Sequence, residues 1–259
     1  MFMEDCLVKS NNMIVEGIYK MELTNRSIAQ ESKAGQFIQI KVNKLEVPLL
    51  RRPISINEIK VNEGTIVIYY KVVGKGTEIM TDIRAEEMIN VIGPLGTGFD
   101  TDMKNKNIAV IGGGIGLAPL IELCKVLHND NNIFSHLGFY DIPYLVDEFK
   151  EYSNNVEIST VTGKVGMKGF VTQGLEKALK DNNIDMIYAC GPNIMLRAIK
   201  DIASNLGIKC QLSLEERMAC GIGACLGCSV ETTEGTMKKV CHDGPVFWSD
   251  EVKLYDEIV

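Results

Sequence analysis

Long runs of lysine or arginine are missing from this 259-residue sequence, and its net charge is −7. A chain of that charge, without a basic stretch, is poorly suited to bind nucleic acid or an anionic membrane surface. No apolar segment is long enough to span a membrane, and the N-terminus, MFMEDCLVKSNNMIVEG, lacks the basic and apolar regions of a signal or transit peptide. We therefore expect a cytoplasmic protein that binds neither nucleic acid nor membrane.

Internal repeats and low-complexity tracts are also absent, so the chain is expected to fold into ordinary compact domains. Hydrophobic residues make up 46% and charged residues 24%, which is typical of a globular protein with a sizeable core. The length suits two domains and a smaller appended segment. Because the cytoplasm keeps thiols reduced, the 8 cysteines indicate metal or redox chemistry more than disulfides.

Residues 1–99 are rich in strand patterns and have no long helical pattern. NMIVEGIYKMEL, QFIQIKV and GTIVIYYKVV alternate or run β-branched and aromatic residues between turn residues. Several short strands of this kind predict a small antiparallel barrel or sandwich. GPLGTGFD, with three glycines and a proline, is interpreted as the exit from this domain.

Residues 100–207 alternate strands with helices, which predicts an α/β domain with a parallel sheet. KNIAVIGGGIGLAPLIELCKVL is a buried strand, a glycine turn and a helix; IDMIYACGP is a strand ending in a turn; NIMLRAIKDIASNLG is a helix closed by glycine. Residues 208–259 begin with one more strand pattern, IKCQLSL, and then become cysteine-rich. We predict these residues to form a small third domain.

Four cysteines gather in the third domain, with the spacing Cys220-x4-Cys225-x2-Cys228-x12-Cys241. The first three follow the plant-type pattern of a [2Fe–2S] cluster, which needs four thiolates from a tight loop. Glycine and alanine between them let the backbone approach closely and direct amide N–H groups at sulfur. Zinc is the alternative, but it usually uses two short cysteine knuckles, whereas Cys241 stands alone.

The glycine turn VIGGGIGLAP follows a predicted strand and precedes a helix. It departs from the usual dinucleotide fingerprint, because Pro119 stands where the last glycine is expected. Proline suits the first turn of a helix, and the free N–H groups there can face a pyrophosphate. The alternative is a tight turn without a ligand. Cys190-Gly191-Pro192 ends another strand of the same sheet, at the edge where ligands of open α/β sheets bind.

Two turns of the first domain contain groups that suit a phosphate or a ring. Arg51-Arg52-Pro53-Ile54-Ser55 offers arginine for bidentate phosphate binding, a stiff turn and a hydroxyl. GKGT, residues 74–77, offers backbone N–H groups and a hydroxyl. Each turn alone is also typical of an ordinary surface loop.

Together these motifs resemble the ferredoxin–NADP reductase superfamily: an RPxS turn in a β-rich domain, then GxGxxP and Cys-Gly-Pro in an α/β domain. The C-terminal LEERMACGIGACLGCSV and VCHDGPVF narrow the resemblance to the electron-transfer subunits of type B dihydroorotate dehydrogenases. The resemblance covers nearly the whole chain, and the four-cysteine segment is its most specific part.

The resemblance implies three cofactors. FAD is expected at Arg52, Pro53, Ile54 and Ser55, at Tyr69, Tyr70 and Lys71, and at Gly76 and Thr77. NAD is expected at Gly112, Gly113, Gly114, Gly116 and Pro119, and near Cys190, Gly191 and Pro192. A [2Fe–2S] cluster is expected on Cys220, Cys225, Cys228 and Cys241.

The resemblance also implies a partner and a direction of electron flow. A separate FMN-containing catalytic subunit oxidises dihydroorotate, and electrons pass through the cluster and FAD to NAD+, in an assembly of two subunits of each kind. No residue of this chain stands out as the acid or base that dihydroorotate oxidation needs. Asp141, after the second strand of the α/β domain, favours NAD over NADP. The alternative is a related reductase subunit, of the sulfide dehydrogenase or ferredoxin–NAD(P) reductase type.

Overall fold

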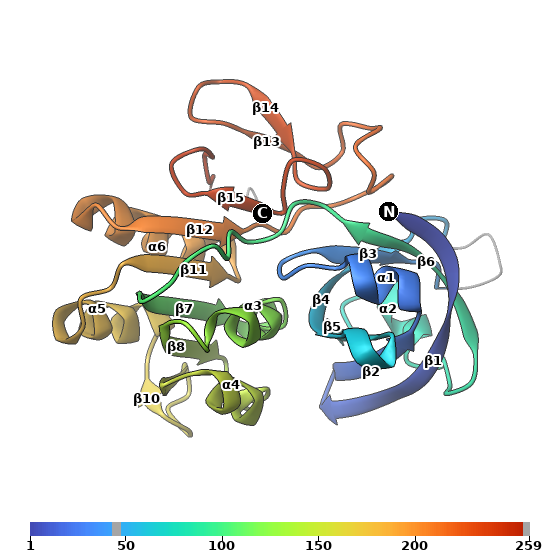
Figure 1. Cartoon of the computed structure of the whole chain (residues 1–259), viewed down its shortest axis with the longest axis horizontal. Coiled ribbons are helices and arrows are strands. Elements are labelled where there is room, and N and C mark those ends of the chain that lie inside the picture. The colour runs from blue at the N-terminus through green and yellow to red at the C-terminus, as the bar shows by residue number, and fades with distance from the viewer. Residues whose placement is uncertain (43–47, 256–259) are drawn as a thin grey trace.

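The computed structural model describes residues 1–42 and 48–255. It contains a β-barrel, an α/β unit and a smaller C-terminal segment that rests on both (Figure 1). This architecture confirms the predicted fold class. No helix in the described ranges is long and apolar enough to cross a membrane.

The N-terminal unit is a closed six-stranded antiparallel barrel, which decides between the barrel and the sandwich. It closes because the first strand pairs with both the second and the sixth. Short helices α1 (Arg26–Glu31) and α2 (Lys75–Met80) and a 3-10 turn at Val61–Glu63 connect strands. In the order β1-β2-β5-β4-β3-β6 around the barrel, the strands are β1 (Phe2–Val15), β2 (Ile18–Thr24), β5 (Thr65–Lys71), β4 (Arg52–Lys60), β3 (Phe37–Ile40) and β6 (Met88–Leu95).

Strand β3 shows how the alternation of side chains organises the barrel. Ile38 and Ile40 are fully buried in the barrel core. Phe37, which points to the opposite face, belongs to a different core that includes Cys228 and Cys241. The outer face of β3 is therefore covered by the cysteine-rich segment and does not face solvent.

The second unit is a seven-stranded sheet with helices on both faces. Strands β10 to β12 are parallel, as predicted, and the last strand, β15, is antiparallel. In spatial order the strands are β10 (Met167–Lys168), β9 (Asn155–Thr160), β8 (Asn132–Phe139), β7 (Asn107–Gly113), β11 (Met186–Cys190), β12 (Lys209–Ser213) and β15 (Val246–Trp248).

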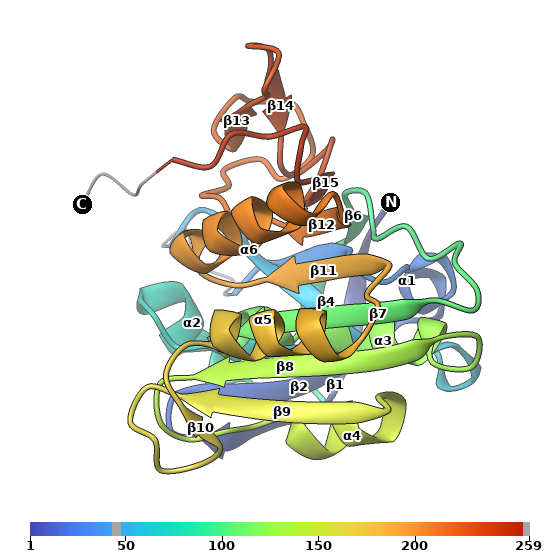
Figure 2. The ribbon, with the colours of Figure 1, turned by 90° about the vertical axis from the view of Figure 1, so that its left-hand side faces the viewer.

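The sheet buries both faces through the alternating residues of its strands. On β7, Ile108 and Val110 pack in the core beneath α3 (Leu120–Leu127) and α4 (Val146–Tyr152), whereas Ala109 and Ile111 pack beneath α5 (Val171–Asp181) and α6 (Asn193–Leu206). Figure 2 shows α5 and α6 along one side of the strands. Helices α3 and α4 lie between the sheet and the barrel (Figure 1).

The C-terminal segment holds the β13–β14 hairpin (Ser229–Glu231 and Met237–Lys239) above the other two units (Figure 1). Both β12 and β15 lie beyond residue 207 in the sequence, yet both extend the sheet of the second unit. Sheet pairing thus continues across the predicted boundary at 207/208. The limits 1–99, 100–207 and 208–259 stay predictions for domain organisation.

Candidate functional site

The four predicted ligand cysteines lie in one region, the cysteine loop (residues 218–242), where backbone N–H groups point at three of the sulfurs. The N–H of Cys225 donates to Cys220 Sγ at 3.3 Å, and the N–H of Gly223 donates to Cys241 Sγ at 3.2 Å. The N–H of Cys241 donates to Cys228 Sγ at 3.4 Å. Hydrogen bonds of this kind stabilise the thiolate form of a cysteine.

The thiols interact as two pairs, Cys220 with Cys225 and Cys228 with Cys241. Burial acts to raise the pKa of Cys220, but hydrogen bonds from the Cys225, Ile222 and Ala224 backbone overcome it and lower the pKa to about 6. Burial raises the pKa of Cys241 to about 12, with the neighbouring Cys228 thiol adding to the effect. Thiolate is the form of cysteine that binds metal, so Cys220 is preset for ligation.

The donor set fits a dinuclear iron–sulfur centre. Two pairs of thiols supply two ligands to each of two irons, which is the arrangement a [2Fe–2S] cluster uses. Gly221 and Gly223 have φ of +68° and +79°, a region that favours glycine, so the tight loop depends on them.

A pocket of about 300 Å³ opens beside Cys241. Its walls come from the cysteine loop and from the end of β6, and they include Ile222, His242, Pro94 and Leu95. A larger hollow of about 520 Å³ lies between α6 and β15, away from the predicted sites. The cysteine loop is the candidate cofactor site although the other hollow is larger, because four thiols are suited to bind a cofactor.

In the barrel, the structure brings together two of the predicted flavin motifs. A Cβ at Gly76 would fall 1.9 Å from the Arg52 guanidinium Nε, so the arginine lies directly against this glycine. Arg52 Nη1 donates to the carbonyls of Leu50 and Arg51. Arg52 and the GKGT turn thus form one corner, which suits a phosphate.

The other residues of these two motifs have structural contacts as well. The Thr77 hydroxyl accepts from the N–H of Val73 at 2.9 Å and donates to the Gly74 carbonyl at 3.0 Å, so it fixes the turn. Pro53, Ile54 and Ser55 are partly buried on β4, opposite β3. Ile54 packs against the barrel core.

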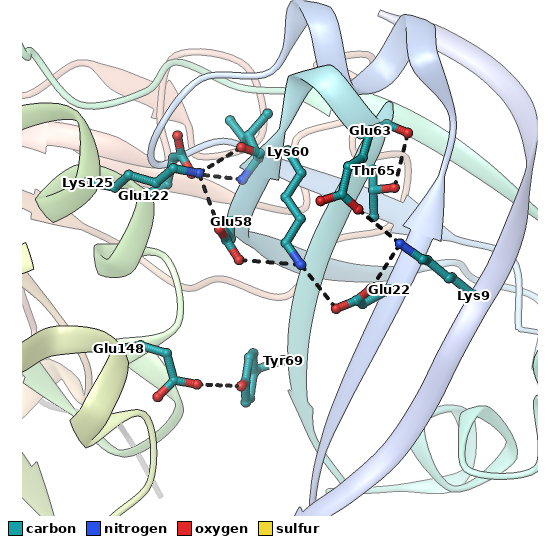
Figure 3. Close-up of polar contacts among 11 residues, drawn as sticks. Lys9, Glu22, Glu58, Lys60, Glu63, Thr65, Tyr69, Glu122, Lys125 and Glu148 are labelled. Carbon is teal, nitrogen blue, oxygen red and sulfur yellow. Dashed lines mark hydrogen bonds and ion pairs between the residues drawn. The ribbon is translucent and has the colours of Figure 1, made fainter. Parts of the chain in front are cut away.

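The predicted flavin-contacting tyrosines are buried, and each hydroxyl has a partner within the protein. Tyr69 OH lies 3.2 Å from Glu148 Oε1 of α4, across the interface with the second unit (Figure 3). Tyr70 stacks on Tyr19 and donates to Asn11 Oδ1 at 3.0 Å. Lys71 is exposed. The contacts of the two tyrosines are structural, and a role for all three residues toward FAD stays a prediction.

The glycine turn follows β7 as predicted, but a 3-10 turn at Gly114–Leu117 precedes α3, and Pro119 is its N-cap residue. Two glycines of this turn are required for different structural reasons. A Cβ at Gly112 would fall 2.3 Å from Leu117, which packs the turn onto the strand, and Gly114 takes the left-handed conformation with φ +57°.

The turn after β7 meets the turn after β11, so the two predicted NAD segments form one surface. A Cβ at Gly116 would fall 2.7 Å from the Cys190 carbonyl oxygen, and a Cβ at Gly191 would fall 3.0 Å from the Gly113 nitrogen. A Cβ at Gly113 would lie 3.0 Å from Pro192. Both turns lie at the carboxyl ends of parallel strands, where α/β sheets bind nucleotides.

Of the two side chains that the sequence singled out for NAD, Cys190 is shielded by burial and Asp141 has partners within the protein. Burial raises the pKa of the Cys190 thiol to about 12, which favours the neutral thiol. Asp141 accepts from Lys164 Nζ and from the Thr162 hydroxyl, each at 2.7 Å. These contacts, with Lys164 first, hold the pKa of Asp141 below its usual value.

Polar contacts between the barrel and the second unit were not predicted from the sequence. Glu122 Oε2 of α3 accepts from the Ile59 N–H of β4 at 2.7 Å, and Lys125 Nζ contacts Glu58 at 3.3 Å (Figure 3). Asn57 Nδ2 donates to the Ala118 carbonyl at 2.8 Å. A polar residue in an alternating strand pattern is predicted to face solvent. The sequence therefore does not indicate that these polar side chains are buried between the two units.

Comparison with known proteins agrees with this geometry. The family model for the iron-sulfur cluster binding domain of dihydroorotate dehydrogenase B matches residues 215–253. The electron transfer subunit of dihydroorotate dehydrogenase B (NAD(+)) from Clostridium perfringens is 41% identical over 95% of this chain and 96% of its own length. The corresponding subunit from Fusobacterium nucleatum is 38% identical over 98% of this chain and 100% of its own length.

Solved structures share the fold. An NADH-dependent reduced ferredoxin-NADP oxidoreductase, from work on flavin-based electron bifurcation, has a TM-score of 0.86 and 32% identity, over 96% of this chain and 90% of that one. The ferredoxin reductase of carbazole 1,9a-dioxygenase has a TM-score of 0.67 and 18% identity, over 80% and 66%, and supports the fold alone. With relatives 38% and 41% identical over nearly their full length, this chain belongs to the family of electron transfer subunits of NAD-dependent dihydroorotate dehydrogenase B.

Proposed function

We propose that this chain carries electrons from a dihydroorotate-oxidising partner to NAD+ in pyrimidine biosynthesis, in the cytoplasm. The observation that carries the proposal is the cysteine loop. Its thiols form two pairs, backbone N–H groups point at three of the sulfurs, and Cys228 and Cys241 share a core with Phe37 of the flavin barrel. A cluster on this loop would lie next to the barrel that holds FAD.

When bound, a [2Fe–2S] cluster would supply one-electron transfer, and FAD would link it to hydride transfer with NAD+. The residues of this chain would bind these cofactors and orient them relative to one another. Cys220, Cys225, Cys228 and Cys241 hold the irons. Arg52 and the turn at Gly76 and Thr77 would hold the FAD phosphates. Pro53, Ile54 and Ser55 would lie near the flavin ring, and Tyr69, Tyr70 and Lys71 would contact it from the next strand.

The nucleotide surface orients NAD. Gly112, Gly113, Gly114, Gly116 and Pro119 would form the pyrophosphate turn, and Cys190, Gly191 and Pro192 would lie near the nicotinamide. Glycine at these positions lets the two turns touch, so the nucleotide can approach the backbone. Asn57 lies on β4, the strand of the RPIS motif and hereafter the flavin strand. Its contact with Ala118 of the pyrophosphate turn orients one proposed binding site against the other.

The partner is an FMN-containing catalytic subunit, in an assembly of two catalytic and two electron-transfer subunits. Support comes from the loop between the ligands, where Leu226 and Ile222 are exposed by 78% and 44%. Exposed apolar side chains around a redox centre suit a protein interface. A cluster in this loop would be near the surface at which the partner donates electrons.

An anaerobic visible spectrum of the purified chain, with and without NADH, tests the cofactors. We expect flavin bands and broad iron–sulfur absorption, both bleached by NADH. Dihydroorotate-dependent NAD+ reduction after addition of the catalytic subunit then tests the reaction. A folded, metal-replete chain without either absorption would contradict the proposal.

A second function is favoured by one observation, the TM-score of 0.86 to an NADH-dependent reduced ferredoxin-NADP oxidoreductase. In that role the chain would exchange electrons with a ferredoxin-linked flavoprotein subunit in place of the dihydroorotate-oxidising one. Purification of the native complex distinguishes the two, because the second subunit would then reduce ferredoxin and not oxidise dihydroorotate.

A further inference from the structure

Gln39 is a buried polar side chain between the flavin strand and the cysteine loop. It lies on β3 and is 0% exposed. Its Oε1 has no hydrogen-bond donor among the residues described, and its Nε2 is 4.0 Å from the weak acceptor Met218 Sδ. Burying an amide that is incompletely hydrogen-bonded costs about 1–3 kcal/mol. A buried polar side chain that lowers stability in this way is a candidate for a functional role.

Gln39 touches both cofactor regions of the chain. In the β3–β4 register it lies opposite Pro53 of the RPIS motif, and opposite residues of paired strands share a face. On its other side, a Cβ at Gly221 would fall 1.9 Å from Gln39 Nε2. The amide therefore contacts the residue that follows Cys220, and position 221 accepts only glycine while Gln39 stays in place.

We propose that Gln39 is a positioning residue for the iron–sulfur cluster. Its amide packs between Gly221 of the cysteine loop and the flavin strand β4, and the N–H that is not directed at Met218 would donate to a cluster sulfur. The inference rests on the proposed placement of the cluster on the four cysteines. It adds a side-chain donor from the barrel to the backbone donors of the loop itself.

The expected consequence is a higher reduction potential for the cluster. An electron added to a [2Fe–2S] centre increases the negative charge on sulfur, and N–H groups aimed at sulfur stabilise that charge. Because the donor comes from β3, the same contact also fixes the distance between the cluster loop and the flavin strand. The cluster potential and the loop position are thus both set by one side chain.

The test is a redox titration of the cofactor-loaded chain, followed by electron paramagnetic resonance of the reduced cluster. Gln39→Met keeps the length of the side chain and removes the N–H groups. We expect the equilibrium constant for cluster reduction to fall about tenfold, which is about 59 mV for one electron. The resonance signal should shift, because the hydrogen bonding of the sulfurs changes.

Gln39→Glu keeps the shape of the side chain and also removes the amide N–H donor. It is the second test variant if Gln39→Met folds poorly. Its added charge should lower the potential further. Gln211→Met is the matched control: Gln211 is also buried, but its Oε1 accepts from the Asp100 N–H in the second unit. This control should lose stability and keep the wild-type cluster potential.

An unchanged potential and resonance signal in both Gln39 variants, with full iron and sulfide content, would overturn the inference. The same shift in Gln211→Met would overturn it too, since the effect would then reflect general loosening. Absence of iron and sulfide from the wild-type chain would instead contradict the proposed cluster. Cofactor analysis of the wild type therefore separates the two failures.

Discussion

Asn57 Nδ2 donates to the Ala118 carbonyl at 2.8 Å, so a strand of the barrel is hydrogen-bonded to the glycine turn of the second unit. Asn57 follows the RPIS motif by two residues, and Ala118 directly precedes Pro119. The contact is buried and connects the proposed flavin strand to the proposed pyrophosphate turn. It therefore sets the relative position of two groups that must exchange a hydride.

Asn57→Ala should slow reduction of bound FAD by NADH by about tenfold or more, because small displacements of reacting groups reduce rates steeply. Stopped-flow absorbance of the flavin measures this rate. Asn132→Ala removes an exposed hydrogen bond at the amino end of β8 and should leave the rate unchanged. Equal rates in wild type and Asn57→Ala would contradict the orienting role.

Glu122→Ala should lower the free energy of unfolding by about 1–3 kcal/mol, since it leaves the buried Ile59 N–H without an acceptor. Glu122→Gln keeps an acceptor oxygen and should lower the free energy of unfolding by a smaller amount. Denaturant titration of the two variants gives the comparison. If both lose the same stability, the carboxylate acts through Lys125 and not through Ile59.

His136 predicts a pH dependence of stability. Burial lowers its pKa, and neither ring nitrogen has a hydrogen-bond partner among the residues described, although Glu157 lies 3.6 Å away. Below its ordinary value of 6.5, the unfolded chain binds a proton that the folded chain does not. Stability should therefore be full above pH 6.5 and fall as the pH decreases toward the lowered pKa.

The difference between wild type and His136→Asn isolates this effect. Urea midpoints measured from pH 7.5 to 5.5 should fall more steeply for the wild type. Other groups titrate in both proteins and cancel in the difference. Parallel curves would exclude His136 as the source of the pH dependence.

Asp141→Asn should raise the preference for NADPH relative to NADH, as the ratio of kcat/KM, by about tenfold. The change removes a negative charge that repels a 2′-phosphate and frees Lys164, which Asp141 now holds at 2.7 Å. Steady-state reduction of an artificial acceptor measures the ratio. Adding Lys164→Met to this variant should cancel the gain; an unaltered ratio in the single variant would place the nucleotide ribose elsewhere.

Leu226→Asp should weaken binding of the catalytic subunit at least about tenfold, because it places a charge in a proposed apolar contact. Leu226 is exposed, so the visible spectrum of the isolated chain should stay the same. Leu206→Asp changes an exposed leucine at the end of α6 and is the control. Wild-type affinity in Leu226→Asp would move the interface away from the cysteine loop.

The parts of this protein that follow a local rule could be predicted from its sequence. The alternation of strands and helices predicted the parallel sheet, and the spacing of Cys220, Cys225, Cys228 and Cys241 predicted a loop that gathers four thiols. In each case the signal lies within a short stretch of chain, or in a spacing that one kind of chemistry demands.

The contacts between distant segments could not be predicted in this way. Gln39 alternates with Ile38 and Ile40, so the strand pattern places it toward solvent; residues about 180 positions later cover it. Asn57 and Glu122 are also buried by contacts between units, since Asn57 of the barrel faces the second unit and Glu122 of the second unit faces the barrel. Such contacts depend on how the units pack, which a period-2 or period-3.6 pattern does not encode.

Strands β12, which is parallel to β11, and β15, which is antiparallel to β12, complete the sheet of the second unit from the far end of the chain. A chain cut at residue 207 would leave β11, whose Ile187, Tyr188 and Ala189 are fully buried, as a bare apolar edge, and such edges promote aggregation. The cysteine loop between these strands is therefore not a cassette that can be transplanted or lost by itself. During synthesis, the nucleotide-binding sheet stays unfinished until Trp248 has left the ribosome, and the sheet and the cysteine loop must mature together.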